Sequence, residues 1–269
     1  MITRNNPPIV TLISDFGLQD EYAGVMKGVI LTHAPEARIV DISHLIPPQS
    51  IRTATYLLIR SYRFFPAHTV HMVVVDPGVG SDRAILAMTA DSHYFVGPDN
   101  GVFTPLFDHA TNPAIYRATI SHRLQRNISS TFHGRDILAP IAGQLAMGRE
   151  ISELGSKISA EQCLRLEEAP CIRQGCTLQG EVIHIDAFGN LCTNIRRQDV
   201  SDFAIRHDIT IEMKNGLVVP LKTTYADGIK GTILALYDSH DHLEIAMNQG
   251  HAAQHLSLAI GDKIVLSHQ

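Results

Sequence analysis

The first half of the chain alternates short apolar runs with segments whose apolar residues recur at every third or fourth position. The runs PPIVTLISD, RIVDIS, TVHMVVVD, AILAMTA and HYFVGP have the length and apolar character of buried strands. Residues 22–33 and 51–62 place apolar side chains on one helical face, Pro66 closes the second helix, and residues 136–147 form a further helix candidate. Strands separated by amphipathic helices predict an α/β domain with a largely parallel central sheet, covered on both faces.

The pattern changes near residue 170, at the linker-like segment EEAPCIRQGC. Six strand candidates then follow at short intervals, separated by turn residues: TLQGEVIHID, DITIEMK, LVVPLK, TILALYD, HLEIAMN and DKIVLS. Short strands at this spacing are typical of a small all-β barrel or sandwich. We therefore predict an α/β domain over residues 1–170 and a smaller all-β domain over residues 171–269.

Charge and composition exclude several classes of partner. The 269 residues include 22 Lys and Arg against 27 Asp and Glu, a net charge of −5. Because the arginines are scattered, we expect neither nucleic acid nor an anionic membrane as a partner. No apolar run approaches the roughly 20 residues of a membrane span, and the first residues lack the apolar core of a secretory signal. Four cysteines without C-x-x-C spacing favour reduced thiols and a cytoplasmic protein.

Acidic residues lie at or near the ends of the predicted parallel strands, where α/β sheets bind ligands. Asp15 closes the first strand and Asp76 the third, whereas Asp41 is followed by two more strand-like residues and is interpreted as structural. An aspartate at a strand end is also a common turn former, so either role fits Asp15 and Asp76.

The segment VVVDPGVGSDR, residues 73–83, fits either a turn or a functional site. Asp-Pro-Gly alone predicts a β-turn. Two glycines let the backbone approach a ligand closely, and Arg83 is spaced to return to Asp76 as a charge-assisted pair. Both a plain turn and a functional site remain open on spacing alone.

Two further segments carry candidate site residues. In TFHGRD, His133 precedes a glycine just ahead of the predicted helix, as either a capping residue or a catalyst. In IDAFGNLCTNI, Asp186, Phe188 and Asn190 form either a hairpin with Phe188 as its plug or a binding loop. A binding loop of this composition offers an acid for an ammonium group, an aromatic face for a base and an amide for recognition.

Metal and cofactor motifs are absent from the sequence. His240-Asp241-His242 is the best local metal candidate among the fifteen histidines, but the chain has no H-E-x-x-H and no zinc-finger spacing. It also lacks the P-loop, the G-x-G-x-x-G and the G-x-S-x-G motifs. We expect no metal and no cofactor.

Seven segments in order along the chain together resemble one family: SDFGLQDEYAGVMKG, DISHLIPPQSI, VVVDPGVGSDR, YFVGPDNGVFT, TFHGRD, IDAFGNLCTNI and LEIAMN. This is the family of S-adenosyl-L-methionine hydroxide adenosyltransferases, relatives of the fluorinase and chlorinase. The combination of DPGVGSDR with FHGRD marks its hydroxide-using branch. The resemblance implies an α/β domain with a C-terminal β-barrel, a homotrimer with sites at subunit interfaces, and hydrolysis of S-adenosyl-L-methionine to adenosine and L-methionine.

The resemblance also implies roles for individual residues. Asp15 would bind the ribose diol, and the trio Asp76, Arg83 and His133 would surround the attacking water. A neutral His can take a proton, an Arg can stabilise developing negative charge and an Asp can orient either the Arg or the water, so the final proton acceptor stays open. The remaining expected substrate contacts lie in the C-terminal domain: Asp186, Phe188, Asn190, Ser239, Glu244 and the backbone at Met247. The segment DSHDH departs from the family's usual loop, and the roles of Asp20 and Asn100 stay open.

Two rival functions are a halogenase acting at the same carbon and a non-catalytic sensor of S-adenosylmethionine or adenosine. A halide must be desolvated by neutral donors, and the Asp76 carboxylate would repel it. In the halogenases the FHGRD position carries an aromatic residue followed by Ser, where this chain has His133 and Gly134. The intact trio likewise argues against a sensor.

Overall fold

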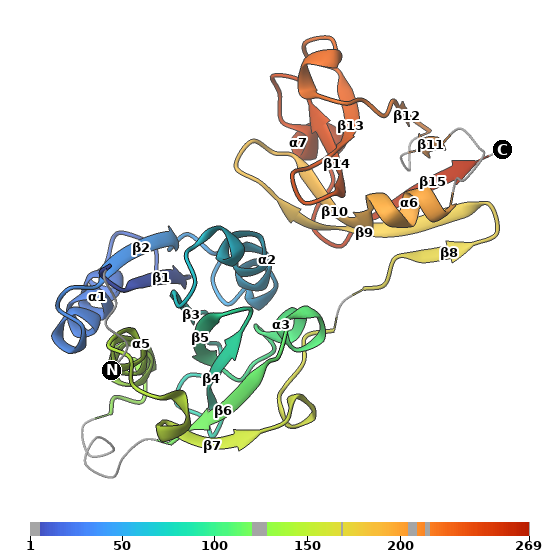
Figure 1. Ribbon diagram of the computed structural model, residues 1–269. Coiled ribbons are helices and arrows are strands. Elements are labelled where there is room, and N and C mark those ends of the chain that lie inside the picture. Colours follow the sequence, from blue (N-terminus) through green and yellow to red (C-terminus); the bar gives the residue numbers. More distant parts are fainter. Residues whose placement is uncertain (1–5, 120–127, 168, 204–208, 213–215, 269) are drawn as a thin grey trace. The chain divides into compact units, whose positions relative to one another are not determined.

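The structure, a computed structural model, describes residues 6–119, 128–167, 169–203, 209–212 and 216–268 (Figure 1). The chain divides into two compact units, Met1–Leu166 and Glu167–Gln269, near the predicted boundary at residue 170. No helix in the described ranges has the length and apolar character needed to cross a membrane.

The first unit is built on a seven-stranded sheet in the order β2-β1-β3-β5-β4-β6-β7. Its strands are Ile9–Ser14 (β1), Arg38–Ser43 (β2), Val70–Val74 (β3), Ile85–Ala90 (β4), His93–Pro98 (β5), Ala114–Ala118 (β6) and Gly155–Ile158 (β7). The four strands β2, β1, β3 and β5 run parallel, whereas β4, β6 and β7 pair antiparallel with their neighbours. The α/β class is confirmed, and the sheet is mixed.

A tight hairpin explains why β4 departs from the parallel arrangement. Only Asp91 and Ser92 separate β4 from β5, and both have positive φ, at 48° and 66°. A two-residue turn with two positive φ values joins antiparallel strands, since a parallel connection needs a crossover of a dozen or more residues.

Helices cover both faces of this sheet. Alternate strand residues contribute to two separate cores: Val10, Leu12 and Met72 lie in one and Ile13, Val73 and Phe95 in the other. The helices α1 and α5 pack on the first core, and α2 and α3 pack on the second. Their bounds are Tyr22–His33 (α1), Ile51–Ser61 (α2), Thr104–His109 (α3) and Ala139–Ala146 (α5). Short 3₁₀ turns also occur at Tyr62–Phe64, Ile151–Glu153 and Ala160–Gln162.

The second unit is an antiparallel sheet that nearly closes into a barrel. Its main strands follow the order β12-β11-β15-β9-β10-β14-β13, and β8 pairs with β9. The strands are Ile172–Gln174 (β8), Thr177–Ile185 (β9), Leu191–Arg196 (β10), Ile209–Glu212 (β11), Val218–Val219 (β12), Ile233–Tyr237 (β13), His242–Met247 (β14) and Lys263–His268 (β15). The helices are Arg197–Phe203 (α6) and Ala252–Leu256 (α7), with a 3₁₀ turn at Tyr225–Asp227.

Backbone hydrogen bonds beside Ala235 bring the two ends of this sheet together. Its N–H donates to the carbonyl of Pro220 over 2.9 Å, and its carbonyl accepts the N–H of Lys222 over 2.7 Å. The segment after β12 therefore pairs with β13, which agrees with the barrel that the family resemblance implied.

Candidate active site

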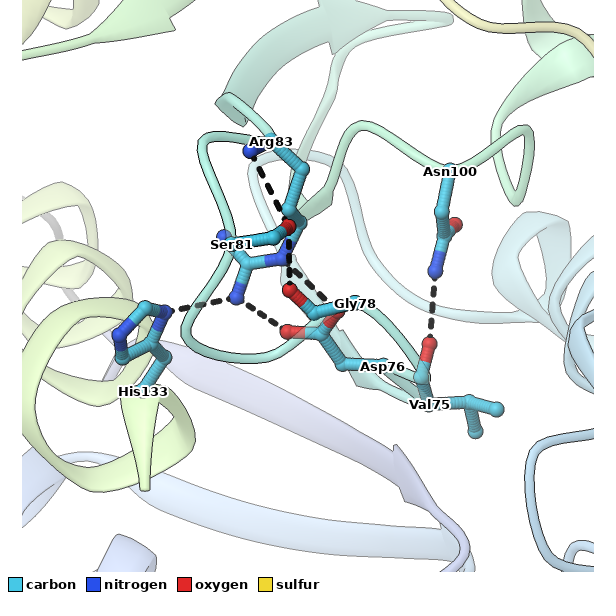
Figure 2. Close-up of polar contacts among 7 residues, drawn as sticks. All are labelled: Val75, Asp76, Gly78, Ser81, Arg83, Asn100 and His133. Carbon is cyan, nitrogen blue, oxygen red and sulfur yellow. Dashed lines mark hydrogen bonds and ion pairs between the residues drawn. The ribbon is translucent and has the colours of Figure 1, made fainter. Parts of the chain in front are cut away.

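Asp76 lies at the carboxyl edge of the parallel strands. The β3 strand ends at Val74, and Asp76 follows after one residue, in the turn DPGVG (Figure 2). Asp15 comes directly after Ser14, the last residue of the parallel neighbour β1. Both acids are thus at the edge where open α/β sheets bind ligands.

Arg83 binds the Asp76 carboxylate through two hydrogen-bond donors. Its Nε donates to Asp76 Oδ1 over 2.7 Å, and its Nη2 donates to Asp76 Oδ2 in a second short contact (Figure 2). Each side chain is only 7% exposed. A bidentate guanidinium–carboxylate pair fixes orientation as well as charge, so the pair expected from the spacing is present and rigidly arranged.

The two glycines of the turn differ in what they require. A Cβ on Gly78 would lie 3.4 Å from Arg83 Cγ and from Ser81 Oγ, so the arginine stem uses the space beside this residue. Gly80 has φ of +80°, and a Cβ there would lie 2.4 Å from the carbonyl oxygen of Ser130. The positive φ favours glycine, and the close backbone approach leaves no room for a side chain.

His133 joins the pair as its third member. Its Nδ1 lies 2.8 Å from Arg83 Nη2 (Figure 2). Because a guanidinium only donates, Nδ1 is the acceptor, and a neutral His133 ring carries its proton on Nε2. Burial, together with the positive charge of Arg83, lowers the pKa of His133 below its ordinary value, and the carboxylates of Asp76 and Asp136 oppose this only in part.

A π-helical turn over Gly134–Leu138 begins immediately after His133 and leads into α5. A Cβ on Gly134 would lie 2.9 Å from Met26 Sδ and 3.1 Å from Val74 Cγ1, so this turn packs directly on α1 and β3. The aromatic ring of Phe132 packs edge-on against Phe16 and Tyr22, with centroids 5.7 and 5.0 Å away. The backbone on both sides of His133 is therefore firmly held.

Asn100 supports the strand end from the opposite side. Its Nδ2 donates to the carbonyl of Val75 over 2.8 Å (Figure 2). Its Oδ1 accepts the N–H of Val102 over 3.2 Å. The residue thus fixes the backbone immediately before Asp76. No sequence pattern indicated this role, because the side chain acts on a backbone carbonyl that any residue would supply.

Asp15 is half-buried, and its Oδ2 accepts the N–H of Gln49 over 2.8 Å. An ionised carboxylate has further lone pairs, so Asp15 keeps capacity for two hydroxyl donors. Asp20 is exposed and lies just before α1, whose N-cap position is taken by Glu21 without a side-chain capping bond.

In the second unit, Asp186 organises the loop between β9 and β10. Its Oδ1 accepts the N–H groups of Phe188 and Asn190 over 2.9 and 2.8 Å, and its Oδ2 accepts Asn190 Nδ2 over 3.0 Å. Phe188 is 77% exposed, so it does not plug the hairpin within this unit. The loop instead presents an aromatic face to the outside.

Glu244 on β14 is buried against β10. Its Oε1 accepts the hydroxyl of Tyr225 over 2.7 Å, and Cys192 Sγ lies 3.5 Å from Oε2. Burial raises the pKa of Glu244, against the lowering effect of these two donors, and the negative charge of Asp186 adds to the increase. Glu244 and Asp186 are therefore electrostatic neighbours.

Met247 and Ser239 lie at opposite ends of β14. Met247 is its last residue, at the end where Leu191 pairs with Ile245 beside the Asp186 loop. Ser239 is exposed in the turn between β13 and β14, where its Oγ lies 3.1 Å from His240 Nδ1. The structure thus brings Asp186, Phe188, Asn190 and Met247 to one end of the unit and leaves Ser239 at the other.

One group of potential metal ligands occurs in the described part of the chain. It comprises Cys192, Asp238 and Glu244, with ligand atoms within 4.8 Å of one another. The predicted local candidate, His240-Asp241-His242, is not part of this group. Since Glu244 already accepts from Tyr225 and Cys192, hydrogen bonds account for its burial.

Comparisons with known proteins identify the family of this chain. Family models for the N-terminal and C-terminal domains of SAM hydroxide adenosyltransferases match residues 10–155 and 180–265. A protein of Thermus thermophilus named (R)-S-adenosyl-L-methionine hydrolase is 36% identical, with 94% of this chain and 96% of the relative covered. A protein of Methanocaldococcus jannaschii with the same name is 34% identical, with coverages of 95% and 94%.

More distant relatives and solved structures complete the comparison. A protein of an Actinoplanes species named fluorinase is 25% identical, with 96% of each chain covered. The crystal structure of an uncharacterized conserved protein from Thermotoga maritima superposes with a TM-score of 0.87 at 34% identity, covering 96% of this chain and 99% of the other. The chain belongs to the SAM hydroxide adenosyltransferase family.

Proposed function

We propose that this protein hydrolyses S-adenosyl-L-methionine to adenosine and L-methionine by attack of water on ribose C5′. The observation that carries the proposal is the contact of Arg83 with both Asp76 and His133 at the carboxyl edge of the sheet. The names of the relatives point to the (R) epimer at sulfur as the substrate. Because the sulfonium is already activated, the proposal needs no metal and no cofactor.

The chemical difficulty lies in the nucleophile. The sulfonium leaves as a neutral thioether, taking the electron pair of the C5′–S bond, so no acid is needed there. Water has a pKa of about 15.7 and must be oriented as its oxygen bonds to C5′. Correct placement of two reactants can supply about 7–11 kcal/mol of the barrier, which makes positioning the main task of the site.

The trio offers donors and an acceptor for one water molecule. The Nε2–H of His133 donates to one lone pair of its oxygen, and the Asp76 carboxylate, with lone pairs left over from Arg83, accepts one of its protons. The second lone pair of the oxygen stays free to attack C5′, and Arg83 holds both partners in place. In this arrangement His133 holds the water by donation, and the proton is released to solvent after the O–C5′ bond has formed. A fixed carboxylate of this kind stabilises the positive charge that develops on the attacking oxygen, without reorganisation.

We further propose that Asp15 binds the ribose diol and that the Asp186 loop contributes substrate contacts. The exposure of Phe188, together with the family membership, supports a homotrimer in which this loop meets a neighbouring subunit. A cytoplasmic location remains part of the proposal.

Hydrolysis in ¹⁸O-labelled water tests the function directly. We expect purified protein to release adenosine labelled at the 5′ oxygen, and to prefer (R) over (S) substrate. Unlabelled adenosine would contradict direct attack at C5′. A 5′-halogenated product that forms only with halide would identify a halogenase, and tight substrate binding without turnover would identify a sensor.

A further inference from the structure

A line of side-chain contacts lies beneath Asp15. Ser14 Oγ is 2.6 Å from His44 Nδ1, and His44 Nε2 is 3.1 Å from Asp41 Oδ1. On the far side of Asp41, Lys27 Nζ lies 2.5 Å from Oδ2. The four residues connect the end of β1 with β2 and α1, next to the proposed ribose-binding carboxylate.

The charges along this line of side-chain contacts favour particular donors and acceptors. Partial burial raises the pKa of Asp41, but the contacts from Lys27 and His44 outweigh it and keep the pKa below its ordinary value. Asp41 is therefore an ionised carboxylate, and its charge favours a proton on His44 Nε2, which lies 3.1 Å from Oδ1 without hydrogen-bond alignment. In the neutral ring Nδ1 then accepts the hydroxyl proton of Ser14. Ser14 Oγ in turn lies 3.5 Å from the N–H of Phe16.

The order Ser-His-Asp is that of a hydrolytic triad, but the burial excludes a nucleophile. Ser14 is 0% exposed and the His44 side chain is also 0% exposed. A nucleophilic serine must reach substrate, and this hydroxyl faces the protein interior. This line of side-chain contacts therefore supports the protein structure and does not react with a ligand.

Backbone hydrogen bonds connect this line of side-chain contacts to the residues on both sides of Asp15. The N–H of Gly17 donates to the His44 carbonyl over 2.7 Å, and the N–H of Ile46 donates to the Ser14 carbonyl over 3.3 Å. Asp15 lies between these two fixed points. The segment carrying His44 also supplies Gln49, whose N–H donates to Asp15 Oδ2. Moving His44 would move both the backbone and a hydrogen-bond partner of Asp15.

We propose that His44 and Asp41 are positioning residues that aim the Asp15 carboxylate at the ribose diol of the substrate. The proposal rests on the proposed function, because it takes adenosine as a product and Asp15 as its diol contact. It makes ribose recognition depend on a buried imidazole that never touches the ligand.

Calorimetric binding of adenosine and of 2′,3′-dideoxyadenosine to the full-length protein tests this role. For His44→Ala, we expect adenosine affinity to fall about tenfold, as when a well-oriented hydrogen bond to a charged group is weakened, with dideoxyadenosine affinity unchanged. Asp41→Asn, at a partly exposed position, should show the same selective loss to a smaller extent. An equal loss for both ligands, or no loss for either, would overturn the proposal.

Two matched controls separate positioning from stability. Thr11 Oγ1 and His71 Nδ1 form a similar buried pair of 2.8 Å from the same strand β1, so His71→Ala should lower stability without changing the ratio of the two affinities. Asp108 pairs with Arg165, and its exposure is comparable to that of Asp41. Asp108→Asn should therefore change neither the stability nor the ratio of the two affinities. If unmodified protein fails to release adenosine from substrate, the proposed function fails; if it releases adenosine but His44→Ala keeps the ratio, only this inference fails.

Discussion

Arg83 Nη2 donates to His133 Nδ1 over 2.8 Å, and this one contact determines which imidazole nitrogen carries the proton. With Nδ1 occupied, the free nitrogen of neutral His133 is a donor. The general-base role that a histidine near a water suggests would require the Arg83 contact to break first. The structure therefore favours a site in which His133 orients the attacking water by donation and Arg83 holds the Asp76 carboxylate that accepts a hydrogen bond from it.

Replacing Arg83 by Lys should separate charge from geometry. A lysine keeps the positive charge but cannot hold both carboxylate oxygens of Asp76 and also reach His133. We expect kcat to fall about 10²-fold or more, the usual effect of removing a preorganised donor, with adenosine affinity little changed. Arg165→Lys, at an exposed ion pair with Asp108, serves as the control and should retain full turnover. Equal kcat in both variants would contradict a role for the guanidinium fork.

Turnover should persist below the ordinary pKa of histidine. Burial and the Arg83 charge lower the pKa of His133, and the neutral ring is the competent form, so kcat should decline only as the pH falls through this lowered value. In Arg83→Gln the second cause is removed, and the His133 pKa measured by NMR should rise, although burial keeps it from rising fully. An unchanged or lower His133 pKa in that variant would show that the Arg83 charge does not lower the pKa of His133.

Asn100→Ala should impair both stability and chemistry. The change leaves the buried Val75 carbonyl without its donor, and we expect a loss of about 1–3 kcal/mol of unfolding free energy together with reduced kcat. Asn194 bridges the Ala169 carbonyl and the Glu181 N–H in the same two-ended manner, so Asn194→Ala is a matched control. Asn194→Ala should lose stability and keep its kcat. A similar loss of kcat in both variants would show that the effect of Asn100→Ala is a general consequence of lost stability.

Gly134→Ser should displace His133 by overpacking. The new Cβ would approach Met26 and Val74 to 2.9 and 3.1 Å, and we expect a loss of about 1–3 kcal/mol of unfolding free energy with a large drop in kcat. Gly28→Ser, on α1 with open space around its Cβ position, should keep full activity. Denaturant unfolding and turnover measured on both variants check the prediction, and a fully active Gly134→Ser would refute it.

The buried pair His71 and His93 should make the first unit sensitive to acid. Burial, and secondarily the neighbouring His93, lower the pKa of His71 from 6.5 to about 3. Below pH 6.5 the unfolded chain takes up a proton that the folded protein refuses, so unfolding free energy should fall by about 1.4 kcal/mol per pH unit from this group. Stability is then lost from pH 6.5 down toward 3. Denaturation between pH 7 and 5 should show a shallower slope for His71→Gln than for the exposed His109→Gln.

Segments with a strong periodic pattern were predictable from the sequence. The strand His93–Pro98 and the helix Tyr22–His33 appear where the apolar residues indicated them. The helix Thr104–His109 and the strand Gly155–Ile158 were missed, because six residues beginning with Thr-Pro and four residues with one large apolar side chain carry too little periodicity.

The site residues also differ in whether the sequence indicated them. The Asp76–Arg83 pair was suggested by spacing, whereas His133 needed the family resemblance, since nothing local connects residues fifty positions apart. Asn100 and His44 were not identified as positioning residues, because each works through backbone carbonyls or buried contacts that only the fold creates. Sequence patterns report on side-chain burial and turn chemistry, and they are silent on which backbone groups need support.

The loop from Asp76 to Arg83 has a consequence for how the site assembles during folding. The two partners of the ion pair are only seven positions apart in the sequence, whereas His133 is fifty positions from Arg83. Closing a short loop loses less chain entropy than closing a long one, so the pair can form early, before the sheet is complete. The third member arrives only when α1, β3 and the π-helical turn have packed together. An early intermediate of the first unit would then already hold two of the three residues, and acquisition of activity would report on the last long-range packing step.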